Sequence, residues 1–242
     1  MRLFRLLLSI LCLIPAITAH AQVGESRRGI AVGVNGGLSM NKISFDPTIK
    51  QAYHLGPSFG LTFRFSSEKY LSAVCALQLE VNYARLGWKE NVLNSADEPL
   101  PDTYQRDQDY IQMPFLARLA WGREERGFMF YFMVGPQIGY CLGESSRRSE
   151  VWTTNAAGQP DRPGDLYAQY DMPVDHKFDY GITGALGVEL NTKIGHFDLD
   201  GRYYYGLSDI YPNGKSDVFA RSNHGTISVR VSYLIDIRKE KR

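Results

Sequence analysis

Bulky apolar residues alternate with small or polar residues in eight stretches of the chain. In residues 53–65, for example, aromatic and aliphatic residues take every second position, and glycine, serine, threonine and other polar residues lie between them. Successive side chains of a strand point to opposite sides, so each stretch predicts a strand with one apolar and one polar face. The predicted strands are 30–40, 53–65, 73–86, 110–121, 128–142, 178–190, 196–207 and 224–235.

The predicted strands and the segments between them have the lengths of an outer-membrane barrel. Strands of about ten residues are long enough to cross a bilayer at a tilt of roughly 45°. The connections alternate strictly between short turns (66–72, 122–127 and 191–195) and long loops (41–52, 87–109, 143–177 and 208–223). Outer-membrane barrels have short periplasmic turns and long outer loops. The pattern predicts an all-β, eight-stranded antiparallel up-and-down transmembrane β-barrel.

The direction of the apolar face separates a membrane barrel from a soluble one. A soluble barrel would bury the apolar face, but an eight-stranded interior holds only its own side chains or one small ligand. The aromatic residues of the apolar face would overfill that space. We therefore expect them to contact lipid and the small residues of the other face to line the lumen. The aromatic residues are Phe59, Phe63, Phe65, Phe115, Phe128, Phe130, Phe132, Phe178, Phe197, Tyr203 and Tyr205.

Four arginines and four acidic residues fall on the inward face. Charges in a confined interior are tolerated when they are paired, whereas an unpaired buried charge is costly. The balance therefore predicts a filled, cross-linked lumen and argues against a wide pore. These residues are Arg64, Glu80, Arg118, Glu189, Asp198, Asp200, Arg202 and Arg230.

The first 21 residues have the features of a secretory signal peptide. Arg2 and Arg5 precede an apolar run over 6–17, and Ala19-His20-Ala21 forms a small-x-small cleavage site. The apolar run is too short to span a membrane.

The rest of the chain predicts one barrel domain, residues 22–237, followed by a basic tail, residues 238–242. Of the 27 Lys+Arg, 25 remain after the two leader arginines are removed, against 26 Asp+Glu, a net charge of −1. This charge gives no reason to expect a nucleic-acid partner. Cys75 and Cys141 are predicted on non-neighbouring strands and opposite faces, so we expect no disulfide between them.

Three histidines are expected near the outer mouth of the barrel: His54, His176 and His224. With Ser58, Asp175 or Asp179 they would form the nucleophile–base pair of a surface hydrolase, and together they would offer ligands to a metal. No H-x-x-x-H spacing supports a metal site. We favour exposed rim and loop histidines without a catalytic role, and expect no catalytic site, cofactor or metal.

Six motifs occur in order along the chain. They are Gly33-Val-Asn-Gly-Gly-Leu-Ser39, Pro57-Ser-Phe-Gly60, Leu77-Gln-Leu-Glu80, Tyr110-Ile-Gln-Met-Pro-Phe-Leu116, Gly135-Pro-Gln-Ile-Gly-Tyr140 and Arg202-Tyr-Tyr-Tyr-Gly-Leu207. In this order the chain resembles the PorT-like outer-membrane β-barrel family of the Bacteroidota. The resemblance implies an eight-stranded outer-membrane barrel and no single activity, although one member assists a gingipain-type (type IX) secretion system. The chain differs from a common outer-membrane pattern because its last strand does not end the protein on an aromatic residue.

Together these patterns predict a non-enzymatic barrel in the bacterial outer membrane, with periplasmic termini and extracellular loops. Its expected role is surface binding, envelope organisation or assistance to secretion. A narrow, porin-like passive channel through the charged lumen is the first alternative, and a surface lipid or peptide hydrolase the second. The expected partners are outer-membrane lipid and other envelope or secretion-system proteins, and the barrel is expected to be a monomer.

Overall fold

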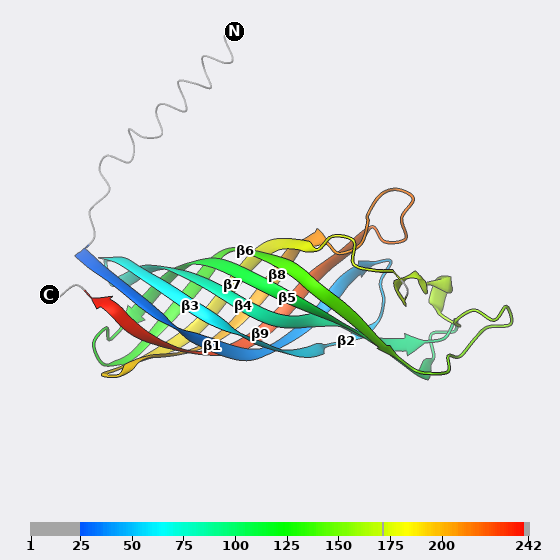
Figure 1. Cartoon of the computed structure of the whole chain (residues 1–242), viewed down its shortest axis with the longest axis horizontal. Coiled ribbons are helices and arrows are strands. Elements are labelled where there is room, and N and C mark those ends of the chain that lie inside the picture. The colour runs from blue at the N-terminus through cyan, green and yellow to red at the C-terminus, as the bar shows by residue number, and fades with distance from the viewer. Residues whose placement is uncertain (1–24, 171, 240–242) are drawn as a thin grey trace, which may run out of the picture.

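Eight long strands pair antiparallel with their sequence neighbours, and the last strand pairs with the first to close a ring (Figure 1). The computed structural model describes residues 25–170 and 172–239, so the expected signal peptide and the last three residues of the expected tail lie outside the described part. The strands are β1 (Glu25–Asp46), β3 (His54–Tyr70), β4 (Ala73–Leu93), β5 (Pro99–Gly122), β6 (Gly127–Arg148), β7 (Phe178–Thr192), β8 (Gly195–Asp209) and β9 (Arg221–Lys239).

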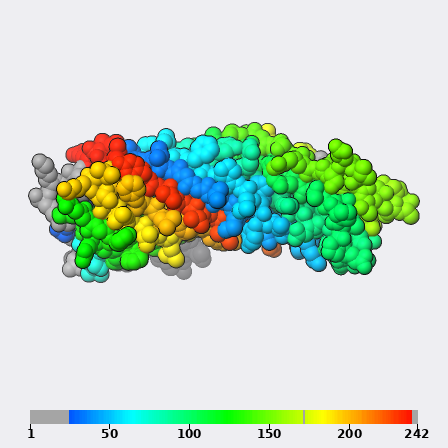
Figure 2. All heavy atoms as spheres, turned by 90° about the horizontal axis from the view of Figure 1, so that it is seen from below, coloured from blue at the N-terminus to red at the C-terminus, as the bar shows by residue number. Residues whose placement is uncertain are grey.

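The ring confirms the predicted fold class of eight antiparallel strands. A two-residue strand, β2 (Gln51–Ala52), pairs with the outer part of β4 and leaves the ring intact. β9 lies directly against β1, and Figure 2 shows the two side by side along the surface. β9 continues through Arg238, which pairs with Ile30, so the strand extends into the expected basic tail. No helix in residues 25–170 and 172–239 has the length and apolar character to cross a membrane.

The two ends of the barrel differ in construction (Figure 1). At one end, the turn end, lie the start of β1, the end of β9 and the three short connections 71–72, 123–126 and 193–194. At the other, the loop end, lie the connections 47–53, 94–98, 149–177 and 210–220. The expected alternation of short and long connections holds, except that 94–98 is short.

Several strands are longer than the sequence pattern suggested. The segment 87–109 was expected to be a loop, but β4 runs to Leu93 and β5 starts at Pro99. The 24 residues of β5 exceed the ~10 that a membrane crossing requires. The wall of the barrel therefore continues at the loop end beyond the apolar exterior. Outward residues such as Lys89 are polar there because that part of the wall faces water.

The exterior is apolar, as the alternation predicted. The interior is mainly polar, with apolar clusters at the loop end and around Leu116, Met129 and Met133. Leu61 is 51% exposed, whereas its neighbour Thr62 is fully buried in the lumen. Phe130 and Leu186 are likewise outward and about two-thirds exposed. Both described cysteines are free thiols, as expected.

Candidate functional site

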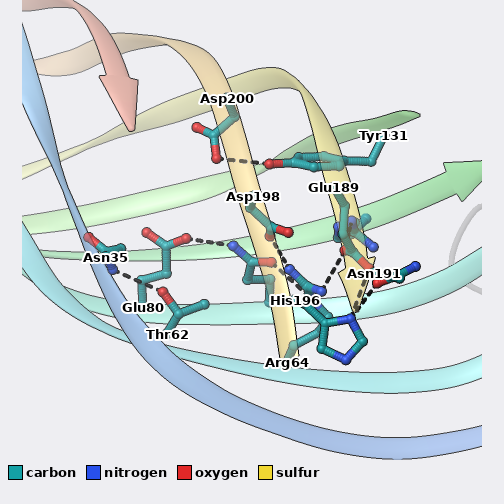
Figure 3. A network of polar contacts seen from close by, with 12 residues as sticks. Asn35, Thr62, Arg64, Glu80, Tyr131, Glu189, Asn191, His196, Asp198 and Asp200 are labelled. Carbon is teal, nitrogen blue, oxygen red and sulfur yellow. Dashed lines mark hydrogen bonds and ion pairs between the residues drawn. The ribbon is translucent and has the colours of Figure 1, made fainter. Parts of the chain in front are cut away.

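The eight charged residues predicted to face the lumen all lie buried inside the barrel, where we call them the lumen network. None is more than 6% exposed. They form two groups of four, one towards the turn end and one further along the lumen. Figure 3 shows part of the network, with side chains from several strands directed towards one another.

The first group contains Arg64, Arg118, Glu189 and Asp198. Arg64 of β3 forms ion pairs with Glu189 of β7, at 2.7 Å between Nη1 and Oε2, and with Asp198 of β8. Arg118 of β5 reaches the same Glu189 oxygen at 2.5 Å. Four strands around the ring are thereby connected through their side chains (Figure 3).

The second group contains Glu80, Asp200, Arg202 and Arg230. Arg202 donates to both carboxylate oxygens of Glu80, and its Nε lies 2.5 Å from Asp200. Arg230 lies 3.3 Å from Glu80 and donates to Ser58 at 2.8 Å. Because each charge has an opposite partner, neither group leaves a free ion site.

Two residues that the sequence reasoning did not single out connect the groups. Gln78 accepts a hydrogen bond from Arg64 and donates one to Glu80. The Tyr131 hydroxyl donates to Asp200 at 3.1 Å, and the Arg118 guanidinium lies 4.1 Å from the centre of its ring. The signal for Tyr131 was its inward position in the alternation of β6, between the buried Met129 and Met133.

Gly187 leaves the room that Tyr131 needs. A Cβ at this position would lie 2.4 Å from the tip of the Tyr131 ring. The glycine on β7 therefore serves close packing in a narrow lumen.

Beyond the lumen network, an apolar cluster fills the barrel at the loop end. Phe45 packs edge-on against Trp88 at 5.4 Å between ring centres, and Tyr211 packs against both rings. Burial raises the pKa of Tyr211. We call this set the loop-end cluster: Ile43, Phe45, Ile49, Trp88, Val92, Tyr104, Tyr170, Val174, Ile210, Tyr211 and Phe219.

The sequence reasoning missed the loop-end cluster because its residues lie in segments expected to be loops. The period-2 pattern of β4 in fact continues through Leu86, Trp88 and Val92, which are all buried. This continued alternation indicates a longer strand. It was not recognised because the residues of the other face, such as Lys89 and Asn91, are polar, as in a loop.

The longest predicted loop, residues 143–177, is folded. β6 takes up the first residues, through Arg148, and Arg162 fastens the remainder. Arg162 is 1% exposed; it pairs with Asp102 at 3.1 Å and donates to the Tyr170 hydroxyl at 2.7 Å. Its guanidinium also lies 4.6 Å from the centre of the Trp152 ring.

Tyr170 connects Arg162 to the wall of the barrel. Its hydroxyl donates to Glu90 of β4 at 2.9 Å. Burial, reinforced by the nearby Glu90 carboxyl, raises the pKa of Tyr170, so the phenol keeps its proton as a donor. A chain of polar contacts therefore holds the loop on the β4–β5 hairpin.

Two of the three histidines expected at an exposed rim are buried, which corrects that expectation. His54 is 2% exposed and its Nε2 lies 2.6 Å from Asp107. His224 is fully buried between Asn41 and the Tyr110 hydroxyl. Both were misplaced because β3 and β9 carry them inside a wall that is longer than expected.

His176 is exposed, as expected, and lies 3.4 Å from Asp175. Both line a shallow surface pocket of about 560 Å³ beside the ends of β7 and β8. The serine of this pocket, Ser208, donates to Asp179 at 2.6 Å instead of to a histidine.

The other elements of the hydrolase and metal alternatives do not assemble. Ser58 is held by Arg230, and Asp179 accepts a second hydrogen bond from Tyr204. Within residues 25–170 and 172–239 there is no group of three or more side chains placed to hold a metal ion.

Comparison with known proteins identifies the family and supplies distant structural likenesses. The model of the outer membrane protein beta-barrel domain family matches residues 20–211. Among solved structures, the chain is similar to OprG from Pseudomonas aeruginosa, with 13% identity over 88% of this chain and 99% of that one and a TM-score of 0.42. It is also similar to the attachment invasion locus protein Ail of Yersinia pestis, with 14% identity over 87% and 99% and a TM-score of 0.36.

Neisserial surface protein A matches at 14% identity over 86% of this chain and 99% of that one, with a TM-score of 0.39. These low identities and scores carry no information about function. No curated protein matches the sequence.

Proposed function

Because the chain belongs to the outer membrane protein beta-barrel domain family, we propose that it is a non-enzymatic outer-membrane protein that binds a partner or ligand at its loop end. The loop end faces the outside of the cell and the turn end, with both termini, faces the periplasm. The PorT-like resemblance adds that the partner belongs to the envelope or to a secretion system. In this role the barrel is a monomeric anchor in the outer-membrane lipid.

The observation that carries this proposal is the folded state of the loop end. Arg162 and the loop-end cluster give the loops a fixed surface, and a surface that is ordered before binding loses less entropy on association. Loops that only covered a pore would not need a buried arginine or an aromatic core.

The orientation is supported by the unequal connections. Outer-membrane barrels place short turns in the periplasm and longer loops outside, and residues 149–177 form by far the longest connection here. An impermeant thiol reagent on intact cells tests this, in a background with Cys75→Ser. Ala157→Cys in the long loop should be labelled, whereas Ile194→Cys at the turn end should be labelled only after lysis. The reverse labelling would overturn the orientation.

The channel alternative is weakened by the contents of the barrel. The lumen network balances its own charges, and the loop-end cluster fills the lumen beyond it. Planar-bilayer recording should therefore detect no single-channel conductance for the purified protein. Steady conductance steps would favour the channel over the binding protein.

The nature of the partner is tested by purification from detergent-solubilised envelopes after mild cross-linking. We expect an envelope or secretion-system protein to co-purify with the intact chain. It should be lost from a variant in which residues 155–160, at the tip of the long loop, are replaced by a short glycine–serine linker. Retention of the partner by the variant without the tip would place the binding surface elsewhere. Absence of any partner from the intact chain would contradict the proposed role.

A further inference from the structure

Three segments of the loop end meet around a small pocket of about 90 Å³. Ile49 comes from the connection before β2, Glu90 and Leu93 from the outer end of β4, and Leu166 and Gln169 from the loop that Arg162 fastens. Aliphatic side chains thus form part of the wall. The carboxyl groups of Glu90 and Asp97 and the carboxamides of Asn91 and Gln169 belong to the same lining. The pocket is large enough for a few heavy atoms.

Glu90 is a buried acid without a counter-ion. It is only 8% exposed, and its Oε1 accepts the hydrogen bond from Tyr170. Its Oε2 has no hydrogen-bond partner among the described residues, and no cation of that part of the chain lies within ion-pair distance of it. A buried carboxyl group in this state is costly unless a donor or a positive charge reaches it.

The arginines on this side of the loop end are already matched. Arg162 is paired with Asp102 at 3.1 Å, and Arg106 with Glu144 at 2.6 Å. Burial raises the pKa of Glu90, and the hydrogen bond from Tyr170 and the charge of Arg162 only partly oppose this effect. A positive charge in the pocket would therefore stabilise the ionised carboxylate.

Gln169 provides a second unused acceptor. It is 1% exposed, its amide nitrogen donates to the Leu166 carbonyl at 3.3 Å, and its Oε1 is without a partner within the described chain. The carboxamide nitrogen of Gln169 has two N–H groups, of which one donates to Leu166. The two unused acceptors, on Glu90 and Gln169, favour a ligand group that carries several hydrogen-bond donors.

We propose that this pocket binds an alkylammonium group, as carried by a lysine side chain of a peptide or by a free primary amine. The ammonium donates to Glu90 and Gln169, and the alkyl stem lies against Ile49, Leu93 and Leu166. This inference rests on the proposed function, because it names the ligand class of the same loop-end surface.

An ammonium fits better than a guanidinium. A guanidinium is a planar fork that prefers both oxygens of one carboxylate, whereas an ammonium is a compact charge with three donors. Glu90 offers only Oε2, since Oε1 is occupied by Tyr170. The charged residues of the pocket lining are Glu90, Asp97 and Lys50, so the lining carries one net negative charge when Glu90 is ionised.

The binding test uses the full-length barrel in detergent micelles and isothermal titration with four probes. These are n-butylammonium, n-butanol, Nα-acetyl-lysine methylamide and Nα-acetyl-norleucine methylamide. We expect saturable binding of the ammonium probes and at least tenfold weaker binding of their uncharged partners. Binding of butylammonium alone identifies a free amine as the source, and binding of the lysine derivative alone identifies a peptide. Equal binding of charged and uncharged probes, or no binding of either ammonium probe, overturns the inference.

Matched variants assign the binding to this pocket. Glu90→Gln preserves an acceptor for Tyr170 but removes the charge, and should weaken ammonium binding at least tenfold. Glu150→Gln removes an exposed acid of the same loop that does not line the pocket, and should leave the affinity unchanged. Lys50→Gln removes the competing positive charge and should tighten binding about two- to fivefold. An unchanged affinity in folded Glu90→Gln would contradict the proposal.

Failure of this inference can be told apart from failure of the proposed function. If Ala157→Cys is labelled on intact cells but neither ammonium probe binds, only the ligand class is wrong. If the loop end proves periplasmic, the proposed surface role fails whatever the titrations show.

Discussion

Arg202 and Glu80 form a two-bond ion pair across the inside of the barrel, with 2.8 Å between Nη1 and Oε2 and 2.9 Å between Nη2 and Oε1. They belong to β8 and β4, which are not neighbours in the ring. The pair therefore connects separate walls of the barrel. A buried pair of this kind contributes less than its Coulomb attraction suggests, because both ions lost water, but removing one partner leaves the other unpaired.

Glu80→Gln should lower the free energy of unfolding by about 3–5 kcal/mol. Glutamine keeps the shape of the side chain but leaves Arg202 and Arg230 with one fewer counter-charge. The measurement is urea unfolding in lipid vesicles, followed by tryptophan fluorescence and by the shift of the folded band on a gel.

The double variant Glu80→Leu with Arg202→Met removes both ions of this pair. The remaining charges of the group, Asp200 and Arg230, are opposite and attract each other, so the double variant should be destabilised less than Glu80→Gln alone. This ordering separates an unpaired buried charge from a simple loss of packing. If Glu80→Gln lowered the free energy of unfolding by well under about 1 kcal/mol, the pair would not have the proposed role in stability.

A charge on the exterior should cost more near the middle of the apolar band than at its edge. Leu61 is outward on β3, where Val34 and Val81 are its cross-strand neighbours, and Leu61→Arg should destabilise by about 2–4 kcal/mol. Ile194 is 69% exposed in the turn between β7 and β8, and Ile194→Arg should cost about 0–1 kcal/mol. If unfolding in vesicles showed an equal decrease in the free energy of unfolding for Leu61→Arg and Ile194→Arg, the apolar band would not face lipid as assigned.

The sequence was sufficient to place Leu61 outside and Glu80 inside. A slip of one residue would reverse every side chain of a strand, so the alternation determines the face over the whole strand. It does not determine which inward residues lie at the same height. The contact of Arg202 with Glu80 depends on the stagger of β4 against β8, which no local pattern records.

The loop-end cluster shows why the strand ends were harder to predict. Trp88 and Tyr104 are fully buried, but they alternate with polar residues that face water, as a loop would. His54 and His224 lie in predicted strands, but the residues that bury them, such as Asp107 of β5 and Asn41 of β1, lie in segments predicted to be loops. The burial of Arg162 was inaccessible from sequence, because Asp102 and Tyr170 reach it only through the fold of the long loop.

Arg162→Met should release the long loop while leaving the barrel folded. It removes the ion pair with Asp102 and the hydrogen bond to Tyr170, and local opening of residues 149–170 should become about 3–5 kcal/mol easier. Hydrogen exchange measured by mass spectrometry should show loss of protection in these residues, with β7 and β8 unchanged.

Arg147→Met is the matched control. Arg147 also pairs with an aspartate, Asp107, at 2.8 Å, but its side chain is 71% exposed. An exposed pair is worth about 0–1 kcal/mol, so protection of the loop should change little. Equal loss of protection in both variants would mean that Arg162 is not what holds the loop.

At the turn end, Glu124 should make stability depend on pH. It accepts hydrogen bonds from Lys69 at 2.7 Å and from Arg27 at 3.0 Å. Partial burial alone would raise the pKa of Glu124, but these two cations outweigh it and hold the pKa below its ordinary value. The contribution of Glu124 is therefore complete above the ordinary glutamate pKa of about 4.3 and is lost as the pH falls through the lower folded value.

Glu124→Gln should accordingly be about 0.5–1 kcal/mol less stable than the parent at pH 7, and this gap should close near pH 3. Lys69→Gln removes one partner of the same carboxylate and should show a smaller gap with the same dependence on pH. Unfolding in vesicles of neutral lipid, at constant ionic strength, measures both. A gap of equal size at pH 3 and pH 7 would show that the loss comes from packing at the turn, because only an ionised Glu124 attracts Lys69 and Arg27.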